Sequence, residues 1–225
     1  MAVVLIPGFM LNHNLWSDFA PALSPFGPSF HSDPDAGNSL EDMARLTLEA
    51  VPPRFSLFGF SMGGYIAREI VRIAPKRVSK LVLIATSSRG DNELQAHRKS
   101  QIANTDLGTF GGVSRKSIRQ SLAPSREQDS ALVERIHHMS VSLGGKTFRR
   151  QASFRRDSDT DRLAEIRCPT LIVAGRHDRL RSLEEAGELH SGIAQSTLVV
   201  LEAGHMIPLE APDELASVVL SFMRT

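Results

Sequence analysis

The sharpest structural signal in the chain is Phe55-Ser56-Leu57-Phe58-Gly59-Phe60-Ser61-Met62-Gly63-Gly64. Its apolar residues 55–58 predict a buried strand, and residues 65–74, directly after it, have helical spacing. Glycines two positions before and two after Ser61 leave room for a sharp strand-to-helix turn. The helix N-terminus that follows favours developing negative charge beside the serine. The stretch therefore predicts an exposed nucleophilic serine at the carboxyl end of a strand.

On both sides of this turn, short aliphatic runs alternate with longer amphipathic segments, which is typical of a parallel sheet with helices on both faces. The predicted strands are Ala2–Ile6, Ser29–His31, Phe55–Phe60, Lys80–Thr86, Thr170–Ala174 and Ser196–Leu201. The predicted helices are Asn14–Leu23, Leu40–Val51, Met62–Ala74, Leu183–His190 and Glu214–Met223. We therefore expect an α/β fold with a mostly parallel sheet of about six strands.

The alternation stops in residues 88–167, where no strand-like run occurs. Helices are predicted there at Asn92–Ala103, Ser114–Leu122, Ser130–Leu143 and Thr147–Phe154. We interpret residues 88–167 as an inserted helical cap and residues 1–87 with 168–225 as the core of the fold.

The composition limits the possible partners of the chain. Among 225 residues, 26 Lys and Arg balance 25 Asp and Glu, so the net charge of +1 supplies no field that would hold nucleic acid or an anionic membrane. No segment has the roughly 20 apolar residues of a membrane span, and the first residues lack a secretory pattern. The single cysteine, Cys168, is expected to be a buried, inert thiol. We expect a cytoplasmic protein, with its oligomeric state open.

Two further residues complete a possible catalytic group with Ser61. His205 follows the last predicted strand, and Asp178 follows the strand before it. A serine hydroxyl needs a base to remove its proton, and a carboxylate that binds the other imidazole nitrogen orients that base. Because parallel strands end at one edge of a sheet, we expect these three side chains to meet there.

Other titratable residues have simpler interpretations. Asp33 and Asp35 are rival carboxylates, but they stand beside Pro and Gly in a sequence typical of turns. His137 and His138 are neighbours on a predicted helix and therefore point apart, which disfavours a shared metal. We expect no metal or organic cofactor.

With these residues in place, the sequence resembles the α/β-hydrolase family, in its compact branch of esterases, lactonases and hydroxynitrile lyases. The matching stretches are Leu5–Phe9, the turn around Ser61, Cys168–Asp178 and Gly204–Pro212. They cover both ends and the middle of the core and leave the cap unmatched. The chain order serine, aspartate, histidine is also the order of that family.

The resemblance implies that the backbone N–H groups of Phe9 and Met62 form the oxyanion hole. The sequence departs from the family at Pro7-Gly8, where many relatives have His-Gly. It also begins at the strand that would be third in the family, which predicts six strands instead of eight and an edge strand that another segment must cover.

The implied reaction is hydrolysis of a small carboxylic ester or lactone through an acyl-enzyme on Ser61. Substrate-pocket candidates include cationic side chains that would bind a substrate carboxylate, although a solvated cap surface is the simpler interpretation of those in the cap. The candidates are Trp16, Arg149, Arg150, Arg155, Arg156, Arg176 and Met206. For Trp16, core packing is the alternative to a pocket wall.

Two alternatives stay open at this stage. A lyase would use the same serine and histidine as acid–base groups without an acyl-enzyme. A non-enzymatic small-molecule receptor is disfavoured because all three triad members are present. Dehalogenase chemistry is disfavoured because it requires an aspartate at the position of Ser61.

Overall fold

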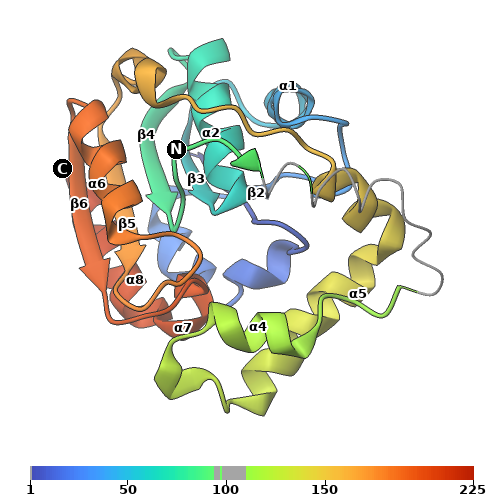
Figure 1. The fold of residues 1–225 in the computed structure, drawn as a ribbon. Helices are drawn as coiled ribbons and strands as arrows, with labels where there is room; N and C mark the ends of the chain where they lie inside the picture. Colours follow the sequence, from blue (N-terminus) through green and yellow to red (C-terminus); the bar gives the residue numbers. More distant parts are fainter. Residues whose placement is uncertain (1, 94–96, 98–109) are drawn as a thin grey trace.

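A computed structural model describes residues 2–93, 97 and 110–225. Its centre is a single sheet of six parallel strands, ordered β2-β1-β3-β4-β5-β6 (Figure 1). The strands are β1 (Ala2–Ile6), β2 (Ser29–His31), β3 (Phe55–Phe60), β4 (Val78–Ile84), β5 (Thr170–Gly175) and β6 (Ser196–Leu201). The predicted six-stranded α/β fold is confirmed, and all five strand pairings are parallel. The largest difference is β4, which begins and ends two residues earlier than predicted.

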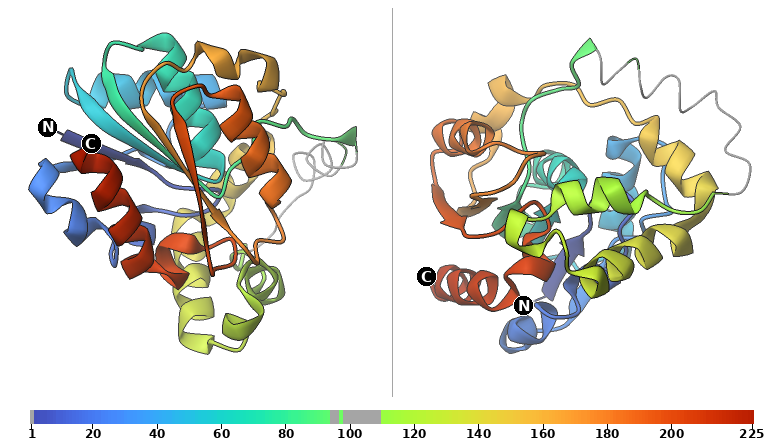
Figure 2. Two further views of the ribbon diagram at one scale, coloured as in Figure 1. Left: turned by 90° about the vertical axis from the view of Figure 1, so that its left-hand side faces the viewer. Right: turned by 60° about the horizontal axis from the view of Figure 1, so that its bottom comes forward.

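Helices cover both faces of the sheet (Figure 2). On one face lie α1 (Leu40–Ala50), α2 (Met62–Ile73) and α6 (Leu183–Gly192), packed on strand residues such as Val4 and Leu57. On the other lie η1 (His13–Trp16), η2 (Ala20–Phe26), α7 (Ile207–Glu210) and α8 (Pro212–Arg224), packed on residues such as Leu5 and Phe58. Successive strand residues point to opposite faces, so apolar side chains at neighbouring positions bury both faces.

The helix predicted for residues 14–23 is wrong, because the chain forms the two short 3₁₀ helices η1 and η2 instead. Proline explains the difference. Pro21 has no N–H to donate to the carbonyl of Ser17, so a continuous α-helix would lose a hydrogen bond and meet a steric clash.

The described residues between β4 and β5 contain helices and no strand. These helices are α4 (Arg115–Ser121), η3 (Pro124–Arg126), α5 (Ser130–Ala152) and η4 (Thr160–Glu165). The helices predicted at 130–143 and 147–154 are parts of α5, which is interrupted at Gly144, where φ is 76°. The helix predicted at 92–103 lies almost entirely outside the described residues. Figure 1 shows α4 and α5 beyond the carboxyl ends of the strands.

The sheet edge at β2 differs from the expectation of a covered strand. Ser29 and His31 are exposed, so within the described residues no segment covers them fully. The length of only three residues limits the unpaired backbone instead. Among the residues that the structure describes, no helix is long and apolar enough to cross a membrane.

Candidate active site

Ser61 lies at the turn between β3 and α2 with the strained backbone angles φ 52° and ψ −112°. The glycines on either side are required by close packing. A Cβ atom on Gly59 would lie 2.5 Å from the carbonyl oxygen of Gly63, and one on Gly63 would lie 2.3 Å from the carbonyl oxygen of Ile6. The hydroxyl of Thr86 donates to the Ser61 carbonyl at 2.8 Å, which helps hold the turn.

The three residues selected from the sequence meet at the carboxyl edge of the sheet. Ser61 Oγ lies 2.9 Å from His205 Nε2, and His205 Nδ1 lies 2.7 Å from Asp178 Oδ2. The side chains of His205 and Asp178 are only 7% and 1% exposed. Because a carboxylate only accepts, Nδ1 carries the proton and Nε2 is free to accept the serine proton.

The loop that carries His205 is held by contacts that sequence reasoning missed. The backbone N–H of His205 donates to the carbonyl of Ser121 at 2.7 Å. The Glu210 carboxylate accepts from the N–H groups of Gly204 and Met206, and also from the N–H of Ala123. Glu210 stands four residues after Met206, at the end of the one-turn helix α7, but its spacing alone does not distinguish it from a solvated helix residue.

Two backbone N–H groups border the cavity beside Ser61. Phe9 follows β1, Met62 begins α2, and both residues line the cavity. Within residues 2–93, 97 and 110–225, neither N–H donates a hydrogen bond. The loop of Phe9 is held by Met10, which has φ 55° and donates its N–H to Gln151 Oε1 at 2.8 Å. Gln151 in turn donates from Nε2 to the carbonyl of Pro34 at 2.8 Å.

A cavity of about 700 Å³ opens over Ser61 and His205. Its walls are mostly apolar and come from the loop after β1, from α4 and α5, and from the loop after β5. Apolar residues that line it include Phe9, Leu11, Leu40, Val113, Ile118, Ile136, Phe148, Phe154 and Leu180. Among the described residues of the lining, the charged side chains are Arg156 and Arg181, and His205 is the remaining titratable group.

Of the pocket candidates predicted from sequence, Met206 lines this cavity beside His205, and so does Arg156. Trp16 does not: it is fully buried in the core, with its ring 6.1 Å from that of Phe19 and 6.5 Å from that of Phe60. Of the two interpretations of Trp16, core packing is the one that the structure supports.

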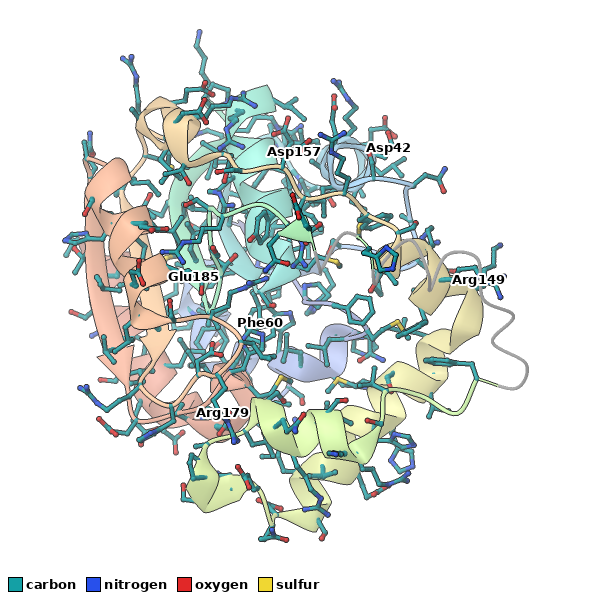
Figure 3. All side chains as sticks on the ribbon, viewed as in Figure 1. Asp42, Phe60, Arg149, Asp157, Arg179 and Glu185 are labelled. Atoms are coloured by element: carbon teal, nitrogen blue, oxygen red, sulfur yellow. The ribbon has the colours of Figure 1, made fainter. Side chains whose placement is uncertain are left out.

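The other cationic candidates lie away from the cavity. Arg149 is exposed on the outer side of α5, away from Phe60 at the centre of Figure 3. Arg150 forms an ion pair of 2.8 Å with Asp35, and Arg176 pairs with Glu202 at the surface. Arg155 is 85% exposed, so the simpler interpretation of a solvated surface holds for it.

The rival carboxylates have structural partners. Asp33 accepts the backbone N–H of Asp35 at 2.8 Å in a local turn. The hydroxyl of Thr147 donates to Asp35 and, together with Arg150, holds the pKa of that carboxyl below its usual value. Asp178, in contrast, is the carboxylate that binds His205.

A buried ion pair ties the helix after Ser61 to the segment that returns to β5. Arg68 of α2 is fully buried and donates to both oxygens of Asp159, at 2.8 and 2.9 Å. Burial by itself raises the pKa of Asp159, but the hydrogen bonds from Arg68 and Arg72 outweigh it and lower the pKa below its usual value. The pair therefore stabilises the ionised carboxylate and keeps α2 in place beneath the site.

His137 and His138 do not form a shared site. His137 is buried with Nδ1 2.9 Å from the carbonyl of Val113, and His138 is exposed. Throughout the described ranges, no group of three or more His, Cys, Asp or Glu side chains is placed to hold a metal ion.

Comparison with known proteins gives a consistent result over nearly the whole chain. The sequence profile of the α/β-hydrolase fold family matches residues 2–212. A pimeloyl-[acyl-carrier protein] methyl ester esterase of Photobacterium profundum is 26% identical over 99% of this chain and 94% of that protein. A putative carbamate hydrolase of Rhizobium rhizogenes is 27% identical over 84% of this chain and 72% of that protein.

Solved structures show the same architecture. A thermophilic esterase from Thermogutta terrifontis matches with a TM-score of 0.88 at 24% identity, and the match covers 100% of this chain and 89% of the esterase chain. An enol-lactonase from Burkholderia xenovorans has a TM-score of 0.89 at 18% identity, with 100% and 91% coverage. At these identities the likeness concerns the fold.

Proposed function

Because the chain belongs to the α/β-hydrolase fold family, we propose that it is a carboxylesterase-type hydrolase that cleaves a small carboxylic ester or lactone at Ser61. The observation that carries this proposal is the pair of hydrogen bonds joining Ser61, His205 and Asp178. The curated relatives, which are named as ester and carbamate hydrolases, support the same class of reaction.

In the proposed acylation, Ser61 Oγ attacks the acyl carbon while His205 Nε2 takes the hydroxyl proton. Electrons of the carbonyl double bond move onto its oxygen, which accepts hydrogen bonds from the N–H groups of Phe9 and Met62. The oxyanion then collapses, the bond to the alcohol oxygen breaks, and His205 returns its proton to that oxygen. Asp178 stabilises the imidazolium throughout. A hydrogen bond from one such N–H group that strengthens in the transition state lowers the activation free energy by about 2.7–4 kcal/mol.

Deacylation repeats these steps with water. His205 takes a proton from water, the hydroxide oxygen attacks the acyl-Ser61 carbon, and the same N–H groups bind the second oxyanion. Collapse breaks the bond to Ser61 Oγ, which regains its proton from His205 as the acid leaves. None of these steps requires a group other than water and the residues named.

Residues 88–167 act in this proposal as a cap that shapes the acyl or alcohol site. In support, the described part of this segment contributes most of the cavity wall opposite the sheet, from Gly112 to Arg156. The mostly apolar wall favours the uncharged body of a substrate, whose burial excludes water from the reacting carbonyl.

The test is turnover of a panel of p-nitrophenyl esters and lactones by the wild type and by Ser61→Ala. Ser125→Ala is the matched control, because Ser125 is exposed in η3. We expect the panel activity to disappear only in Ser61→Ala. We also expect a fluorophosphonate to add to Ser61, which intact mass and peptide mapping would detect.

Two outcomes contradict the proposal. Activity that survives in folded Ser61→Ala would remove Ser61 as the nucleophile. Proton elimination from a substrate with Ser61 required, but with no acyl-enzyme trapped in a rapid quench, would assign the lyase chemistry instead.

A further inference from the structure

Arg181 is a nearly buried cation whose guanidinium donates no hydrogen bond within the described residues. Its side chain is 15% exposed, it lines the cavity over Ser61, and its Nε atom is buried without a partner. Its one ion-pair partner among the described residues is Glu185, whose Oε1 lies 3.5 Å from Nη1. A buried charge without hydrogen bonds is costly, so its retention in a cavity points to a ligand that supplies them.

Glu185 accepts no hydrogen bond from the guanidinium of Arg181, although it lies 3.5 Å from Nη1. Its Oε2 atom accepts the backbone N–H of Ser182 at 2.7 Å and its own N–H bonds the Ser182 hydroxyl, which together cap α6. Glu185 is therefore engaged in starting the helix, and a nitrogen to oxygen distance of 3.5 Å leaves the strong fork geometry of arginine and carboxylate unmade.

Three other arginines with largely buried side chains, one in the cavity wall and two elsewhere, differ from Arg181. Arg156, also in the cavity wall, has its guanidinium on the buried carboxylate of Asp91, at 2.7 and 2.9 Å. Arg72 and Arg150 each have a buried Nε without a hydrogen-bond partner among the described residues, but both donate hydrogen bonds through their other nitrogens. Among these four arginines, Arg181 alone donates no side-chain hydrogen bond within the described residues.

The position of Arg181 links it to the chemistry. It stands three residues after Asp178, and its backbone N–H donates to Asp178 Oδ1 at 2.9 Å. Its loop also supplies Leu180 to the cavity wall, and none of the described residues that line the cavity is an aspartate or glutamate. Within the described part of the wall, a substrate anion would therefore meet the guanidinium of Arg181 and no lining carboxylate, although Glu185 lies 3.5 Å from Nη1 of Arg181.

We propose that Arg181 binds a carboxylate carried by the substrate in addition to its scissile ester or lactone. Two parallel N–H to oxygen bonds from the guanidinium orient such a carboxylate and hold the remote end of the substrate while the carbonyl lies at Ser61. This inference rests on the proposed hydrolase function and adds the substrate class, an acidic half-ester or carboxylated lactone.

The experiment compares charged and neutral esters of matched length by pH-stat. For a carboxylate on the acyl side the pair is monoethyl adipate and ethyl hexanoate; for the alcohol side it is 4-acetoxybutanoate and butyl acetate. The proteins are the wild type, Arg181→Met and Arg181→Lys. Arg162→Met is the control, since Arg162 is a surface residue paired with Glu165.

We expect the wild type to prefer the charged member of one pair. In Arg181→Met the ratio of charged to neutral kcat/KM should fall about 10- to 100-fold, mainly through KM, as for loss of a hydrogen bond to a charged group. Arg181→Lys should restore part of the ratio and Arg162→Met should not change it. The pair that responds identifies the side of the ester on which the carboxylate lies.

An unchanged ratio in Arg181→Met, or an equal loss on both members, overturns the assignment while Ser61-dependent turnover still supports the hydrolase. If the wild type hydrolyses none of the four esters, calorimetric binding of adipate tests the carboxylate site at Arg181 without turnover. Adipate binding to Ser61→Ala that weakens about tenfold or more on adding Arg181→Met upholds the carboxylate site, and equal binding rejects it.

Discussion

The carboxylate of Glu210 holds His205 from both sides, because it accepts the N–H of Gly204 at 3.2 Å and that of Met206 at 2.9 Å. It also accepts the N–H of Ala123, just after α4, at 2.7 Å. The loop of the catalytic base and the segment over the cavity therefore share one anchor. Small shifts of a positioned base cost large factors in rate.

We predict that Glu210→Ala lowers kcat by about 10- to 100-fold with a smaller change in KM, because the imidazole loses its fixed position relative to Ser61. The kcat of Glu210→Gln, which keeps one acceptor oxygen, should lie between those of the wild type and Glu210→Ala. Steady-state kinetics on the best ester of the panel measures this, with Glu49→Ala on the exposed side of α1 as the control. An unchanged kcat in both Glu210 variants would show that the loop is held without this carboxylate.

Asp178→Asn should lower kcat by about 10⁴-fold while the protein stays folded, because an amide no longer fixes the tautomer or stabilises the imidazolium. The rate of fluorophosphonate labelling at Ser61 should fall with it. Asp161→Asn, a change at an exposed position of η4, is the control. Labelling at the wild-type rate in Asp178→Asn would mean that another carboxylate orients His205.

Gln151 supports the loop of Phe9 from α5, and it is only 2% exposed. In Gln151→Met, the N–H of Met10 loses its partner, and the carbonyl of Pro34 keeps only its hydrogen bond from Arg150, which should cost about 1–3 kcal/mol of folding stability. A mobile Phe9 N–H should also lower kcat about tenfold or more. Denaturant unfolding and kinetics test the two effects, with the exposed Gln128→Met for comparison. A loss of stability with full kcat would separate Gln151 from the oxyanion site.

Asp159→Asn should lower the free energy of unfolding by about 3 kcal/mol at neutral pH, because it leaves Arg68 buried without a counter-charge. Asp157→Asn, which removes an exposed partner of Arg155, should change it by less than about 1 kcal/mol. Urea denaturation of both variants provides the measurement.

The ion pair of Arg68 and Asp159 also predicts how the free energy of unfolding depends on pH. The folded pKa of Asp159 is lowered below its ordinary value of 3.8, so its stabilisation is full above that value and is lost as pH falls through the lowered pKa. Between pH 5 and the acid limit, stability should therefore fall less steeply in Asp159→Asn than in the wild type. Parallel curves would assign the acid sensitivity to other carboxylates.

Features that depend on neighbouring residues could be predicted from the sequence. Alternating apolar runs indicated the parallel sheet, and the glycines around Ser61 indicated its turn, because local backbone sterics allow few other solutions. The prediction for residues 14–23 failed although its cause, Pro21, is also local and readable.

The selection of Ser61, Asp178 and His205 followed from strand order, since parallel strands that end at one edge must bring their following loops together. The sequence by itself therefore determined the fold class and which three residues would meet. Only the packing of distant segments decided which arginines line the cavity and which carboxylate supports the backbone around His205. Arg150 of α5 lies away from the cavity in an ion pair with Asp35, whereas Arg181 lines the cavity together with segments distant in the chain. Glu210 joins the loop of His205 to Ala123, 87 residues earlier in the chain. Side-chain direction depends on helix phase and on docking, which short-range sequence patterns do not specify.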